Sequence, residues 1–213
     1  AVECALGGAY GCTGQRCTAS SRLIVEAPLH DAFVARLRQR VAALRVGHAL
    51  EKGIEVGPVV DAPHLERHLE SVRSAQEEGA ELVTGGEALQ RPSRGHYMSP
   101  ALFIAQPQHR VAREEIFGPM ACVLRADDYE HALALANDTS WGLVAGICTR
   151  SLAHATHFRR HAKVGMTMVN LPTTSEDHHA PFGGRKASGY GPRAQGRQAA
   201  EFYTTLKTGY MLA

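Results

Sequence analysis

One short segment of the sequence combines residue types that could carry out covalent chemistry. Cys17 follows a Gly14-Gln15 turn and is followed by small residues. Small residues let backbone amides approach a reacting atom, and an exposed loop thiol can ionise to a nucleophilic thiolate. A lone loop cysteine is also often unreactive, so the residues alone leave Cys17 as either a nucleophile or an ordinary thiol.

The segment resembles the active-site signature of the NAD(P)-dependent aldehyde dehydrogenase superfamily: an aromatic residue, three spacers, Gly-Gln-x-Cys and small residues. The matching residues are Tyr10, Gly14, Gln15, Cys17, Thr18, Ala19 and Ser21. The resemblance implies that Cys17 attacks an aldehyde to form a thiohemiacetal, that hydride passes to NAD or NADP, and that water hydrolyses the resulting thioester. It also implies that the backbone N–H of Cys17 helps to hold the oxyanion. Cys12 and Cys122 carry no comparable motif and are expected to be structural thiols.

Further motifs follow in family order, so the resemblance covers essentially the whole chain. They are Gly57-Pro58, residues 114–119 (EEIFGP), residues 137–143 (NDTSWGL), Asn170, residues 181–184 (PFGG), and Lys186 with Ser188-Gly189. By itself the Glu114-Glu115 pair would be a solvated helix end. The resemblance instead implies that Glu115 accepts hydrogen bonds from the nicotinamide ribose hydroxyls and that Phe117 packs nearby, and a carboxylate can accept from two vicinal hydroxyls at once.

The segment from Asn170 to Arg193 resembles the 2-oxoglutarate semialdehyde (2,5-dioxopentanoate) dehydrogenase group within the superfamily. This resemblance implies that Asn170 lies near the substrate entrance. Arg185 or Arg193 could pair with a substrate carboxylate, since a guanidinium matches that geometry, or could serve an oligomer interface. His178-His179 predicts no metal site, because neighbouring residues of an extended chain point to opposite sides and no third ligand is evident.

The resemblance also bears on domain organisation. The family's N-terminal Rossmann-like cofactor domain, its Glu-Leu-Gly-Gly-Lys motif with the general base, and its oxyanion-hole asparagine have no match in these 213 residues. We therefore expect residues 1–200 to be the catalytic domain and residues 201–213 an oligomerisation strand, with the cofactor domain absent from this chain. The isolated chain is expected to be inactive as a dehydrogenase. The choice between NAD and NADP depends on residues of the cofactor domain.

Two other classes of function compete with a dehydrogenase. A non-enzymatic truncated relic, serving as an oligomerisation or interaction module, would need neither the Gly-Gln-x-Cys signature nor the Glu-x-Phe motif. A cysteine hydrolase would need a histidine partner, and none of the 12 histidines lies in a recognisable hydrolase motif. The retained motifs favour the dehydrogenase, whose small-molecule substrate is an aldehyde.

The elements that must position these residues can be predicted from hydrophobic periodicity. Strands are expected at residues 23–25, 82–83, 121–124, 143–148 and 164–169, and helices at residues 28–44, 62–78, 128–136 and 151–162. This alternation predicts an α/β fold, a mostly parallel sheet with helices on both faces. Residues 173–197 are expected to form a functional or interface loop. Residues 201–212, rich in Thr, Tyr and Phe, predict a long C-terminal strand that could make an oligomer contact, and the family resemblance implies a dimer or tetramer.

Composition excludes several other classes. The chain is 44% hydrophobic and 21% charged, which is typical of a globular protein and not of a disordered or collagen-like one. With 23 Lys and Arg against 21 Asp and Glu, there is no basic surplus for nucleic acid. No apolar stretch or leader pattern predicts a membrane span or secretion, so a cytoplasmic protein is expected. The five cysteines form no CxxC pair, which argues against a disulfide framework or structural zinc.

Overall fold

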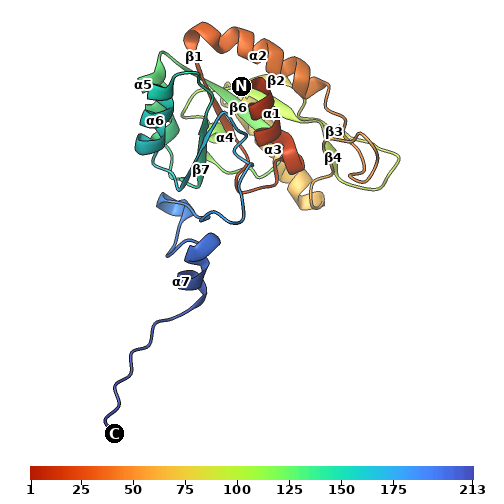
Figure 1. The fold of residues 1–213 in the computed structure, drawn as a ribbon. Helices are drawn as coiled ribbons and strands as arrows, with labels where there is room; N and C mark the ends of the chain where they lie inside the picture. Colours follow the sequence, from red (N-terminus) through yellow and green to blue (C-terminus); the bar gives the residue numbers. More distant parts are fainter.

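The computed structural model describes all residues from 1 to 213, and a four-stranded sheet lies at its centre (Figure 1). The strand order is β1 (Arg22–Glu26), β6 (Met120–Ala126), β5 (Ala101–Ile104) and β2 (Glu81–Thr84). β6 pairs in parallel with both β1 and β5, whereas β2 is antiparallel to β5. The prediction of a mostly parallel sheet is therefore confirmed.

Helices cover both faces of this sheet, as predicted. On one face, α1 (Val2–Tyr10) and α2 (Ala27–Ala42) pack on Ala121 and Val123 of β6. On the other face, α3 (Ala62–Glu77) and α4 (Arg110–Arg113) pack on Met120, Cys122 and Leu124. Successive side chains of a strand point to opposite faces, and a strand buried on both faces is apolar throughout. β6 shows this pattern over residues 120–124, and Arg125 is its one exposed, charged residue.

The second half of the chain adds a smaller layer beside the main sheet. β7 (Val144–Ile147) and β8 (Met166–Val169) form a separate parallel pair, and α5 (Tyr129–Asn137) packs with α6 (Leu152–His161) through Leu133 and Phe158. Two helix starts are capped by side chains, since Asp128 accepts from His131 N at 2.8 Å and Ser151 accepts from His154 N at 3.2 Å. A short hairpin joins β3 (Ala88–Leu89) and β4 (Tyr97–Met98).

Residues 173–197 are largely irregular, as predicted, with short 3₁₀ turns at Lys186–Ser188 and Gly196–Gln198. The prediction of a C-terminal strand is wrong for the single chain. Residues Ala199–Tyr203 form a short helix, α7, and the last ten residues extend away from the body without pairing (Figure 1). A strand needs a neighbouring strand for its N–H and C=O groups, and none lies beside this tail. The oligomer contact stays a prediction, and the tail's apolar side chains, such as Leu206 and Tyr210, are exposed.

No helix is both long enough and apolar enough to cross a membrane.

Candidate active site

Cys17 lies in a loop that reverses the chain between α1 and β1. Cys12, Thr13 and Gly14 all have positive φ, at 51°, 61° and 64°, so the chain turns back sharply after α1. Tyr10 anchors the end of the helix, because its buried hydroxyl donates to the carbonyl of Ala101 at 3.0 Å. Burial raises the pKa of Tyr10 and keeps it neutral. The reversal brings Cys17 to the surface, where its side chain is exposed.

The cysteine loop is held on one side by the residues that lead into α3. The Gly57 N–H donates to the Thr13 hydroxyl oxygen at 3.1 Å, and the Val60 N–H donates to Oε1 of Gln15 at 3.0 Å. The Gly-Gln turn of the signature and the Gly57-Pro58 motif are therefore in contact. The glutamine of the signature therefore fixes the loop through its side-chain amide.

The start of the long loop holds the other side. The Thr173 hydroxyl donates to the carbonyl of Thr18 at 2.7 Å and lies 2.8 Å from the Ser20 hydroxyl. Arg16 forms an ion pair with Glu176, which is 160 positions later in the sequence. Sequence reasoning missed Arg16 and Glu176, since no local pattern links residues so far apart.

The other cysteines differ in environment. Cys122 is fully buried in the sheet, and burial raises the pKa of its thiol to about 12, as expected for a structural thiol. Cys12 is exposed, contrary to the expectation that it is structural, and so is Cys148. Exposure alone therefore does not distinguish Cys17 from Cys12 and Cys148.

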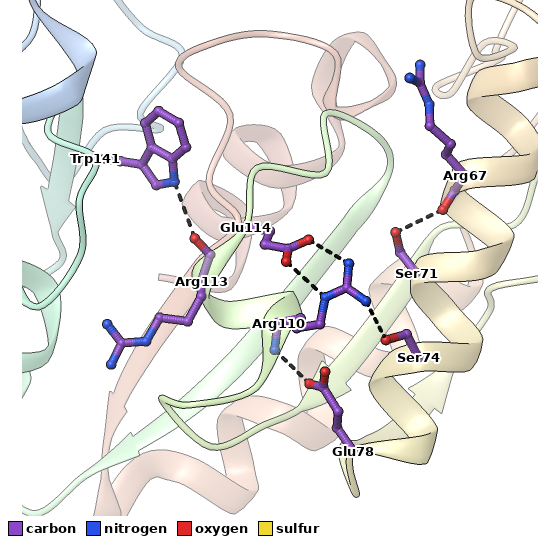
Figure 2. A network of polar contacts seen from close by, with 8 residues as sticks. All are labelled: Arg67, Ser71, Ser74, Glu78, Arg110, Arg113, Glu114 and Trp141. Carbon is purple, nitrogen blue, oxygen red and sulfur yellow. Dashed lines mark hydrogen bonds and ion pairs between the residues drawn. The ribbon is translucent and has the colours of Figure 1, made fainter.

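The segment before Glu115 is tied to α3 by a polar network (Figure 2). The Arg110 guanidinium donates to both oxygens of Glu114, at 2.9 and 3.0 Å. It also donates to the Ser74 hydroxyl at 3.1 Å, while the Arg110 backbone N–H donates to Glu78 at 2.7 Å. The hydrogen bonds from Arg110 lower the pKa of Glu114, so this carboxylate stays charged. The Glu114 carboxylate therefore already has its hydrogen-bond partner, Arg110, within the chain.

Glu115 and Phe117 have the opposite character. The Glu115 side chain is exposed and has no hydrogen-bond partner in the chain, so its carboxylate can receive hydroxyl donors. Phe117 has a φ of 57° and is 42% exposed as a residue. The left-handed turn presents the ring outward, although a residue of this size would normally be buried.

One cavity of about 1050 Å³ brings together most of the predicted site residues: Cys17, Glu115, Phe117 and Asn170 all line it. The amide of Asn170 is bonded to Thr149, accepting from its N–H at 2.8 Å and donating to its carbonyl at 2.9 Å. In the chain, Asn170 therefore joins the ends of β7 and β8.

Arg185 and Arg193 do not line this cavity. The Arg193 guanidinium donates to the carbonyl of Gly184 at 2.6 Å, and the Arg185 side chain is exposed. Nearby, Lys186 donates to the carbonyls of Asn137 and Thr139 at 2.8 and 2.9 Å. Lys186 therefore fixes the turn of the NDTSWGL motif, residues 137–143.

The expected geometry around His178 and His179 was wrong, because Asp177 lies close to both rings. Asp177 and the two histidines place ligand atoms within 4.8 Å of one another. All three side chains are exposed, and Asp177 already accepts hydrogen bonds from the backbone and ring of His179. The arrangement is a turn at the surface.

A sequence model of the aldehyde dehydrogenase family matches residues 1–209. The chain belongs to the aldehyde dehydrogenase family. It is 35% identical over 99% of its length to the alpha-ketoglutaric semialdehyde dehydrogenase of Bacillus subtilis, and 37% identical over 99% to the 2,5-dioxopentanoate dehydrogenase of Saccharolobus solfataricus; it covers 44% of each relative. The structure of HpcC from Thermus thermophilus matches 97% of the chain, which covers 41% of it, with a TM-score of 0.92 and 39% identity.

This aldehyde dehydrogenase chain spans less than half the length of the curated relatives it matches. Within that span, an exposed thiol, a free carboxylate and an exposed aromatic ring face one cavity. Such a set can hold a small molecule, attack it covalently, and bind a hydroxyl-bearing group beside it.

Proposed function

We propose that the chain is the thiol-bearing catalytic part of an aldehyde dehydrogenase that oxidises an aldehyde to a carboxylate with NAD or NADP. The observation that carries the proposal is that Cys17 and Glu115 line the same cavity, Cys17 exposed and Glu115 free of partners. A module used only for interaction would need neither group there.

In the proposed reaction, the Cys17 thiolate attacks the aldehyde carbon, and a C–S bond forms as the carbonyl oxygen becomes an oxyanion. The backbone N–H of Cys17 donates to that oxyanion. Loss of hydride from the carbon leaves a thioester on Cys17. Water then adds to the thioester and gives up its two protons to solvent, the C–S bond breaks, and the carboxylate leaves while the Cys17 thiolate is regenerated.

Glu115 and Phe117 are the residues that would hold the cofactor. The partner-free Glu115 carboxylate fits two vicinal ribose hydroxyls, and the exposed Phe117 ring offers an apolar surface beside it. When bound, NAD or NADP accepts the hydride. In the chain itself, Arg110 holds the Glu114 carboxylate through hydrogen bonds, and the neighbouring Glu115 lines the cavity without a partner.

For the substrate, we propose 2-oxoglutarate semialdehyde, with its carboxylate paired to Arg185 or Arg193. The names of two relatives support this class, although a betaine aldehyde dehydrogenase of Cereibacter sphaeroides is equally similar at 38% identity. Both arginines lie in the loop whose start, Thr173, is hydrogen-bonded to the cysteine loop. Steady-state kinetics of the complete enzyme test this assignment. The oxo-acid semialdehyde should exceed a simple aliphatic aldehyde in kcat/KM, and the reverse order would show it to be wrong.

Alkylation tests the role of Cys17 directly. We expect iodoacetamide near neutral pH to modify Cys17 faster than Cys12 or Cys148, which are also exposed, because a nucleophilic thiol is more ionised than an ordinary one. Peptide mass spectrometry at short times measures the order of labelling. Cys17→Ser should abolish the fast phase, and Cys12→Ser should leave it unchanged. Equal labelling of the three thiols would instead favour a non-enzymatic relic.

A further inference from the structure

A buried histidine, His68 on α3, contacts the turn that carries Glu115 and Phe117. His68 is 1% exposed, and its Nε2–H donates to the carbonyl of Ile116 at 3.2 Å. Its other ring nitrogen, Nδ1, is buried without a partner. Because a charged ring would bury a second N–H without an acceptor, the ring is neutral and its one hydrogen bond points to Ile116.

The ring also packs directly on Gly118. A Cβ built on Gly118 would lie 2.5 Å from Cε1 of His68, so only glycine allows the ring to approach the backbone so closely. On the other side, the Gly118 carbonyl meets Gly14 of the cysteine loop, where a Cβ would lie 2.7 Å from the Gly118 carbonyl carbon. Gly118 is therefore sandwiched between the histidine and the loop that carries Cys17.

α3 and the residues before it thus contact both the cysteine loop and the segment that leads to Glu115. Residues 57–60 are bonded to Thr13 and Gln15 of the cysteine loop. Ser74 and Glu78, at the far end of the helix, are bonded to Arg110 (Figure 2). His68 lies between these two sets of hydrogen bonds in the sequence, and its ring contacts the Glu115–Gly118 turn directly.

We infer that His68 is a positioning residue that fixes the Glu115–Gly118 turn against the cysteine loop. The inference rests on the proposed roles of Cys17 and Glu115. His68 is not inferred to contact substrate or cofactor. Its ring acts through the Ile116 carbonyl and through Gly118.

Protonation should destabilise the fold around this contact, because the Nε2–H donor stays but a charged ring is buried. Burial lowers the pKa of His68 below its ordinary value, and the hydrogen bond to the Ile116 carbonyl, with a smaller effect of the Phe117 backbone, partly opposes the fall; the charges of His64 and Arg67, both on α3, lower it further. Between the lowered pKa and the ordinary histidine value of about 6.5, the unfolded chain binds more protons than the folded one. Stability therefore falls as the pH drops through this window, because a second ring N–H would be buried without an acceptor.

Hydrogen–deuterium exchange of the 213-residue chain tests the inference. In His68→Leu, which removes the donor, peptides covering residues 11–18 and 114–120 should exchange about tenfold faster, while α5 should not change. In His68→Gln, whose amide can donate from the Nε2 position, both peptides should exchange as in the wild type. His64→Gln is the matched control on the same helix face, and it should leave both peptides unchanged.

A second measurement needs no variant. Nitrogen-15 spectra of the wild type should show a neutral His68 with the proton on Nε2, and the amides of Gly118 and Gly14 should titrate with the midpoint of His68. Uniformly faster exchange in His68→Leu, or amides that ignore this titration, would overturn the inference even if Cys17 proves reactive. An inert Cys17 with unchanged exchange results would overturn the proposed function and leave the contact between the two segments in place.

Discussion

Mixed with NAD and an aldehyde, the purified 213-residue chain should form NADH at least about a thousandfold more slowly than a complete aldehyde dehydrogenase. Removal of a single oxyanion-hole donor costs about 10²–10³ in kcat. The resemblance assigns the oxyanion-hole asparagine, the general base and the dinucleotide fold to a portion of the family that these residues do not match. The relatives are more than twice as long as the part of them that the chain covers.

Absorbance of NADH measures this rate, and the reaction without aldehyde is the baseline. Acylation by an activated ester provides the control that the thiol is intact, because that step needs the thiolate and no dinucleotide. The wild type should be acylated at Cys17 while forming no NADH. Turnover near that of complete enzymes would contradict the expectation and show that the cavity around Glu115 suffices for catalysis.

Much of the fold was predictable because its signals are local. α2, α3, α5 and α6 have apolar residues at helical spacing, and their predicted ranges agree closely with the observed ones. β5 was missed, although it lies in the middle of the sheet. Its four residues form a short apolar run after Pro100, and periodicity cannot separate such a run from a loop or a helix end.

The site was predictable where one segment carries the chemistry, and not where distant segments meet. The motifs around Cys17 and Glu115 predicted roles for both residues, and the two residues line one cavity, while the roles themselves stay predictions. The ion pair between Arg16 and Glu176 and the contact of His68 with Ile116 depend on the path of the chain in space. The expected C-terminal strand has no neighbouring strand in the single chain, and β propensity alone forms no strand there, so its pairing within an oligomer stays a prediction.

Gly14 should be the least replaceable residue of the cysteine loop. Its φ is +64°, a conformation that costs an L side chain free energy. A Cβ there would also collide with the carbonyl of Gly118 and lie 3.0 Å from the carbonyl oxygen of Ala9. All these atoms belong to the backbone, so no side chain can rotate away to relieve the clash. The cysteine loop and the Glu115–Gly118 turn would have to separate.

Gly14→Ala should therefore lower the free energy of unfolding by about 2–4 kcal/mol and abolish the preferential alkylation of Cys17. Urea denaturation, followed by the fluorescence of Trp141, the single tryptophan, measures the first effect. Gly11→Ala is the matched control, because Gly11 has a φ of −55° and a Cβ there would meet nothing within 4 Å. If the two substitutions prove equally mild, the contact between Gly14 and Gly118 does not hold the site together, and the glycine of the signature must be explained by the chemistry at Cys17 alone.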